Sequence, residues 1–158
     1  MVLFMRNKIA KLIAALGDRN IDEVQKFLAK GLSPNLTLED GEFLLYKAVV
    51  INSLPLVKTL VEKSANINLA TRTNETALHV AAKEGYADIV EYLLDKGATV
   101  DIKTTKAFKV EGDRTQEFAN DSYTPLLWAC MNGHKRVVEL LIANRADIEA
   151  ICMGGSLR

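Results

Sequence analysis

In the stretch "TNETALHVAAKEGYADIVEYLLDKGATVDI", residues 73–102, apolar residues recur at the spacing of two short amphipathic helices. The first run comprises Leu78, Ala81 and Ala82, and the second comprises Ile89, Val90, Leu93 and Leu94. Gly85 separates the runs, and Gly97 follows the second run as a residue that can take the left-handed conformation that ends a helix. The stretch therefore predicts a helix pair that cannot bury its apolar faces alone.

The same pattern recurs along the chain. One equivalent position is held by Gly31, Ser64, Gly97 and Arg145, which lie 33, 33 and 48 residues apart. A small-residue position is held by Ala15, Ala48, Ala81 and Ala129, and a core position by Val24, Val57, Val90 and Val138. The spacing predicts four units, at about 5–37, 38–70, 71–103 and 119–151, an insertion at 104–118, and the start of a further unit at 152–158. Stacking of the units supplies the missing core.

Two stretches, 73–102 and "DSYTPLLWACMNGHKRVVELLIANRADIE" at 121–149, resemble ankyrin repeats. The resemblance rests on the 33-residue period, on the openings Thr76-Ala77-Leu78-His79 and Thr124-Pro125-Leu126, and on the steps Gly85-Tyr86 and Gly133-His134. It implies an all-α ankyrin-repeat solenoid of stacked helix-turn-helix units with β-hairpin-type loops. The first and second units lack the Thr-Pro-Leu-His opening, and Leu127 stands where the fourth unit's histidine is expected.

Composition narrows the classes of function. The chain has 158 residues and equal numbers of basic and acidic side chains, 20 of each, so no net charge attracts nucleic acid. Arg6, Lys8 and Lys11 interrupt the apolar residues near the start, and no apolar run is long enough for membrane insertion. Two cysteines, Cys130 and Cys152, form no disulfide framework, which favours a reducing, cytoplasmic setting.

The residue pattern does not favour catalysis or a cofactor. The chain has two histidines, and the repeat pattern uses both, since the resemblance places His79 in the turn that opens a helix, bonded to Thr76. Cys130 and His134 are four residues apart but make only half of a zinc site. Carboxylate pairs such as Glu39 and Asp40 are expected on solvated faces with unshifted acidity. We expect no enzyme activity, no cofactor and no metal.

The resemblance implies that binding uses the concave side, formed by the loop tips and the ends of the first helices. Mapped onto this chain, the candidate partner-binding residues are Glu39, Asp40, Glu42, Val50, Ile51, Arg72, Glu75, Lys83, Glu84, Phe108, Tyr123 and Met131. Two interpretations of Val50 and Ile51 stay open, either as exposed anchors for a partner or as packing between units. Trp128 is expected in the core, and the acidic tip at 39–42 is expected to form a polar rim.

Three features outside the regular units carry further expectations. In segment 104–118, Phe108 and Val110 alternate with Lys109 before the turn signal Glu111-Gly112-Asp113, which favours an ordered hairpin over a tolerated insertion. No polar capping helix follows the fourth unit, so we expect a piece of a longer repeat protein or self-association through the open flank. The leading hypothesis is a protein-binding module, and the alternative is the recognition domain of a larger enzyme or effector.

Overall fold

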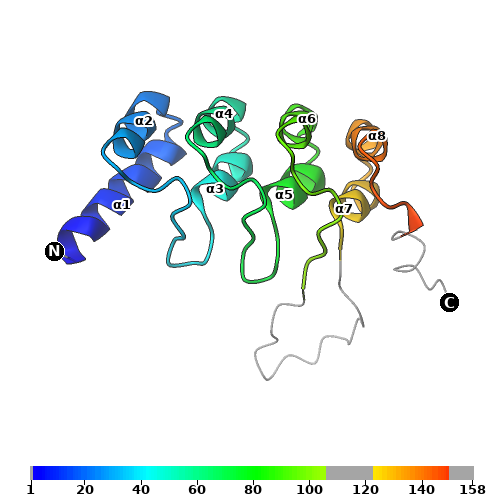
Figure 1. Cartoon of the computed structure of the whole chain (residues 1–158), viewed down its shortest axis with the longest axis horizontal. Helices are drawn as coiled ribbons and strands as arrows, with labels where there is room; N and C mark the ends of the chain where they lie inside the picture. Colours follow the sequence, from blue (N-terminus) through cyan, green and yellow to red (C-terminus); the bar gives the residue numbers. More distant parts are fainter. Residues whose placement is uncertain (1, 106–122, 150–158) are drawn as a thin grey trace, which may run out of the picture.

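The computed structural model describes residues 2–105 and 123–149, in which eight helices form four consecutive pairs (Figure 1). The pairs are α1 (Val2–Gly17) with α2 (Ile21–Ala29), α3 (Leu44–Val50) with α4 (Leu54–Glu62), α5 (Ala77–Glu84) with α6 (Ala87–Asp95), and α7 (Pro125–Met131) with α8 (Lys135–Ala143). The odd-numbered helices form one row, which we call the inner helices, and the even-numbered helices form a second row, the outer helices (Figure 1). The expected solenoid of stacked helix pairs is confirmed.

Left-handed residues end the helices at equivalent places in every pair. Positive φ angles between inner and outer helix occur at Arg19, Asn52, Gly85 and Gly133. They recur after each outer helix at Gly31, Ser64, Gly97 and Arg145, the position that revealed the period in the sequence. The backbone therefore needs the same left-handed step in all four units, whether or not the residue is glycine.

Buried residues at equivalent positions build one continuous core. Leu12, Leu45, Leu78 and Leu126 are all buried, as are the four small residues Ala15, Ala48, Ala81 and Ala129. The alanines leave room for close approach between α3, α5 and α7, and α5 contacts both of the other two. Val24, Val57 and Val90 are also buried, whereas Val138 in α8 is partly exposed.

The loops connect the units through a repeated hydrogen bond. A side-chain oxygen in one unit accepts a backbone N–H of the next, from Asn66 to Asn35 at 2.6 Å and from Thr99 to Asn68 at 2.8 Å. Asp101 accepts from the backbone N–H of Asp147 at 3.0 Å, so the same link continues across the inserted segment. Isolated antiparallel bridges, Thr37 with Phe43 and Ala70 with Thr76, close the first two loops.

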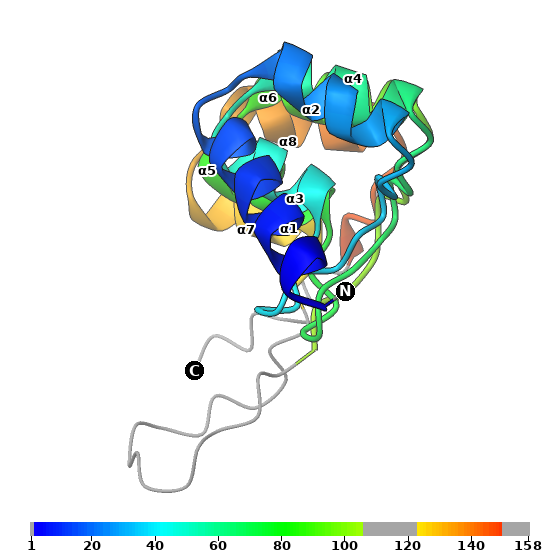
Figure 2. The ribbon, with the colours of Figure 1, turned by 90° about the vertical axis from the view of Figure 1, so that its left-hand side faces the viewer.

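Helix α1 departs from the other inner helices. It has 16 residues, against seven or eight in α3, α5 and α7, and it runs obliquely past them (Figure 2). The apolar side chains of α1 are only partly covered, because Leu12 and Leu16 are buried whereas Ile13 is 40% exposed. Ile13 and Ile9 instead line a groove of about 570 Å³ between α1 and the first loop, closed on the loop side by Leu38.

Candidate interaction surface

The inner helices turn one side toward the loop tips, and we call this side, together with the tips, the inner face. Two contacts define it. In α3, Lys47 binds the first loop through Asp40 at 3.0 Å, and in α7, Trp128 packs against Tyr123 with ring centroids 4.9 Å apart. Val50 and Met131 follow Lys47 and Trp128 by three residues and so lie on the same helix side.

Val50 and Ile51, for which two interpretations were open, have different environments. Val50 is 46% exposed on the inner face. Ile51 is half-buried and packs against the core, and its carbonyl accepts a hydrogen bond of 2.7 Å from the guanidinium of Arg19. Val50 is therefore available to a partner, whereas Ile51 connects the first two units.

Trp128 is not a core residue, contrary to the expectation from sequence. Its position is equivalent to that of Lys47 in α3, which faces the loops, so the indole is half-buried on the inner face. The ammonium of Lys83 lies 5.0 Å from the centroid of the indole ring. Within the described part of the chain, the indole Nε1 is buried without a hydrogen-bond partner. Met131, one turn further along α7, is 60% exposed.

The acidic tip at 39–42 is paired with cations and does not form a free acidic rim. Lys47 binds both Asp40 and Glu42, and Arg6 lies 3.3 Å from Glu39. The backbone N–H of Glu42 and the ammonium of Lys47 lower the pKa of Asp40, which corrects the expectation of an unshifted acid. The hydrogen bond from Lys47 to Glu42 in turn raises the pKa of Lys47.

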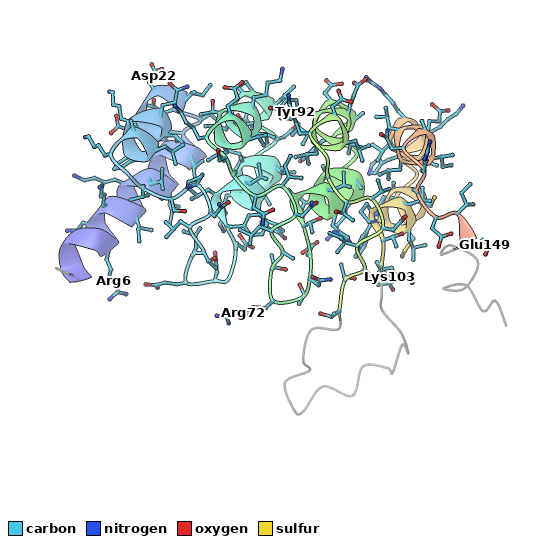
Figure 3. All side chains as sticks on the ribbon, in the orientation of Figure 1. Arg6, Asp22, Arg72, Tyr92, Lys103 and Glu149 are labelled. Atoms are coloured by element: carbon cyan, nitrogen blue, oxygen red, sulfur yellow. The ribbon has the colours of Figure 1, made fainter. Side chains whose placement is uncertain are left out.

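The second loop places Glu75 and Arg72 differently. Glu75 accepts a hydrogen bond of 3.0 Å from the hydroxyl of Tyr46, so it connects the second and third units. Burial, followed by the nearby charge of Glu75, raises the pKa of Tyr46. Arg72 is exposed at the loop tip, on the opposite side of the molecule from Tyr92 of the outer helices (Figure 3).

Lys83 and Glu84 are both exposed at the end of α5. Phe108 and the predicted hairpin turn at 111–113 lie outside the described residues. Sequence reasoning missed Lys47 and Arg6, which neutralise the acidic tip, and it misplaced Trp128. The equivalence of positions 47, 80 and 128 was a signal that would have placed the tryptophan beside the loops.

His79 holds a structural hydrogen-bond network. The His79 side chain is fully buried. Its Nδ1 accepts a hydrogen bond of 3.1 Å from the backbone N–H of Thr76, and the Thr76 hydroxyl lies 2.8 Å from the same nitrogen. Because Nδ1 accepts, the proton is on Nε2, which donates to the carbonyls of Ile102 at 2.9 Å and Tyr123 at 3.2 Å. Burial lowers the pKa of His79 to about 4, so the ring is neutral at pH 7.

His134 is also engaged by its neighbours. Its Nε2 lies 2.9 Å from the carbonyl oxygen of Lys83, and its ring sits against Gly85. Among the residues that the structure describes, no group of three or more His, Cys, Asp or Glu side chains is arranged to hold a metal ion. In the same residues, no helix is long and apolar enough to span a membrane.

Family models match most of the chain. The model of ankyrin repeats in three copies matches residues 12–104, and that of a single ankyrin repeat matches residues 121–152. The chain belongs to the ankyrin-repeat family. The two matches leave out residues 105–120.

The chain is similar to curated proteins of different kinds. The chain is 39% identical over 103 residues to BRCA1-associated RING domain protein 1 of Caenorhabditis elegans, covering 65% of this chain and 14% of that protein. It is 32% identical over 137 residues to palmitoyltransferase Hip14 of Drosophila melanogaster, covering 85% of this chain and 19% of that protein. It is 30% identical over 109 residues to protein phosphatase 1 regulatory subunit 27 of Mus musculus, covering 68% of each. The chain thus spans under a fifth of the first two relatives.

Proposed function

We propose that this ankyrin-repeat domain is a non-catalytic module that binds a partner protein on its inner face, the side that the resemblance to ankyrin repeats implies. The observation that carries the proposal is the exposure of Val50 and Met131 at equivalent positions of α3 and α7, on the side that faces the loops. Exposed apolar side chains rimmed by polar residues mark interaction surfaces. The charged residues of the first loop form this polar rim, in which Lys47 pairs with Asp40 and Glu42.

The arrangement of polar groups supports binding over catalysis. The buried histidine, His79, is neutral and donates to two backbone carbonyls, so it offers no free nitrogen to a substrate. His134 is bonded through Nε2 to the backbone of α5. We place the module in a reducing compartment, since the two cysteines of the sequence form no disulfide framework.

A second candidate is a recognition domain within a larger enzyme or effector. This candidate is favoured by coverage, because the chain spans 19% of a relative whose name is palmitoyltransferase Hip14. In both cases the inner face is the binding surface that we propose.

The test is a quantitative pull-down from native cytosol with the Val50→Asp/Met131→Asp double variant. Both side chains are exposed, so the melting temperature should change little, whereas a charge buried without a partner in an interface should remove the proteins captured by the wild type. Ile142→Asp is the matched control, because Ile142 is an exposed apolar residue of an outer helix, at 42%.

Captured proteins that survive the double variant but are lost with Ile142→Asp would contradict binding on the inner face. That outcome would place the binding surface on the last unit. It would also prompt a measurement of molecular mass in solution, since self-association was expected through that flank.

A further inference from the structure

In α3, α5 and α7, one equivalent position is held by an apolar residue, then a lysine, then an apolar residue. Val50 of α3, Lys83 of α5 and Met131 of α7 are separated by 33 and 48 residues, as the units are, and all three are exposed. The helices follow one another in this order, with α5 in contact with both neighbours (Figure 1). We call these three residues the central row.

Lys83 is a cation without a carboxylate partner among the described residues. The other lysine of the inner face, Lys47, binds two carboxylates of the first loop. The ammonium of Lys83 instead lies over the indole of Trp128, 5.0 Å from its centroid, and the ring restricts the flexible side chain.

Glu84 is the one acidic neighbour in sequence, and it lies outside the central row. It follows Lys83 by one residue, and successive residues of a helix point about 100° apart. Its equivalent in α3 is Ile51, which packs toward the core, and its equivalent in α7 is Asn132. No ion pair joins Glu84 to Lys83 in the described structure.

The dimensions of the row fit a helix. Packed helices lie about 8–10 Å apart, so Val50 and Met131 are separated by roughly 16–20 Å. A helix rises about 1.5 Å per residue and covers this span in about 11–13 residues. Residues i, i+4, i+7 and i+11 share one helix face, so a single helix can present apolar residues at both ends and a charged residue between them.

We propose that the central row receives an amphipathic helix of the partner, with apolar residues at i and i+11 and an aspartate or glutamate at i+4 or i+7 that pairs with Lys83. The inference rests on the proposed function, because it requires the inner face to be the binding surface. The apolar residues of the helix contact Val50 and Met131, and its carboxylate compensates the one cation of the row. Specificity comes from the acid, since an apolar or basic residue there leaves Lys83 desolvated and unpaired.

The experiment is a selection of binders from a phage-displayed library of random 16-residue peptides, with the whole chain as bait. The enriched peptide is then titrated by fluorescence anisotropy. We expect enriched sequences to carry an acid four or seven residues after an apolar residue, with a second apolar residue at i+11. Lys83→Glu should raise the Kd at least tenfold, and exchanging the acid of the peptide for lysine should restore binding to that variant.

Lys58→Glu is the matched control, since it makes the same charge change on the outer helix α4 and should leave the Kd within twofold. Lys83→Met keeps an apolar stem without the charge and should weaken binding less than Lys83→Glu. Circular dichroism and melting temperature of each variant establish that the fold is retained.

A selection that enriches no binder, or peptides without an acid at the stated spacing, would overturn the inference. Equal effects of Lys83→Glu and Lys58→Glu would overturn it as well. If selected peptides that lack the acid lose affinity for the Met131→Asp variant, the inner face is still the binding surface and only the acidic helix is excluded. If they lose affinity with Lys58→Glu alone, the proposed function fails together with the inference.

Discussion

His79 joins parts of the chain that are far apart in sequence. Its Nε2 donates to carbonyls 23 and 44 residues away, at the two ends of the connection that contains the inserted segment. The ring must be neutral for this, because Nδ1 accepts from Thr76 and loses that capacity on protonation. His79 thus makes the stability of the domain depend on pH.

The pKa of His79 is about 4 in the folded state and about 6.5 in a model peptide, so the unfolded chain binds more protons between these values. The contribution of the neutral ring is complete above about pH 6.5 and is lost as the pH falls toward 4. Unfolding by urea should therefore show a free energy of unfolding about 2 kcal/mol lower at pH 5 than at pH 7.

The control for this pH dependence is a pair of histidine variants. His79→Gln should flatten the dependence between pH 5 and 7, whereas His134→Gln, at the only other histidine, should retain it. An unchanged slope in His79→Gln would show that other groups carry the effect.

Gly85 meets two separate constraints. Its φ is 76°, and a Cβ atom there would lie 2.5 Å from Nδ1 of His134. We expect Gly85→Ala to cost more than the roughly 1–2 kcal/mol of a left-handed alanine, because the His134 ring must also leave its hydrogen bond with Lys83. Gly97→Ala, at φ 89° with open space around it, isolates the backbone cost. Equal losses of melting temperature in the two variants would contradict the steric argument.

At the scale of the helix, the turn after each outer helix imposes a left-handed residue even where the sequence has no glycine. Ser64 and Arg145 have φ angles of 66° and 65°, the conformation of Gly31 and Gly97 at the equivalent position. A side chain in this conformation is strained. The helix ends are thus determined by the geometry of the stack, and the residue type follows it only in part.

Ser64→Gly should raise the free energy of unfolding by about 0.5–1 kcal/mol, since relief of the left-handed strain exceeds the added entropy of the unfolded chain. Lys63→Gly is the control one residue earlier, where φ is −89° and glycine brings only the entropic cost. Chemical denaturation of both variants provides the measurement. A destabilised Ser64→Gly protein would mean that the serine side chain makes a contact that outweighs the strain.

At the scale of the whole molecule, the described helices form a row of units, and their main contacts join units that follow one another in the chain. α5 has inner helices on both sides, whereas α1 has a neighbour on one side and lies obliquely to it (Figure 1). In such an array, stability is the sum of unit and interface contributions. Damage to the first unit should stay local, and damage to an internal unit should spread.

Leu12→Ala and Leu78→Ala test this difference at one equivalent, fully buried position. Each should cost about 2–5 kcal/mol of local stability through the lost contacts and the cavity. Hydrogen exchange read by mass spectrometry should speed up mainly within residues 6–37 for Leu12→Ala, and throughout the described units for Leu78→Ala. The same spread of exchange in both variants would indicate one all-or-none cooperative unit.

The sequence by itself determined the repeat and the all-helical class. A 33-residue period places the same leucine, alanine and left-handed residue in each unit, and these residues act through local backbone geometry and contact with the adjacent unit. Such interactions can be read from one unit and applied to the others, whereas the structural place of His79 was implied by the resemblance to ankyrin repeats.

Only the tertiary structure decided which side of each inner helix is covered. It placed Trp128 on the inner face, exposed Val50 while half-burying Ile51, and paired Asp40 with Lys47. An amphipathic pattern indicates that a helix has a buried side, but not where the neighbouring loop ends or which ion pair it forms. Those outcomes depend on contacts between side chains of different helices and loops, and the distances between them arise only when the units stack.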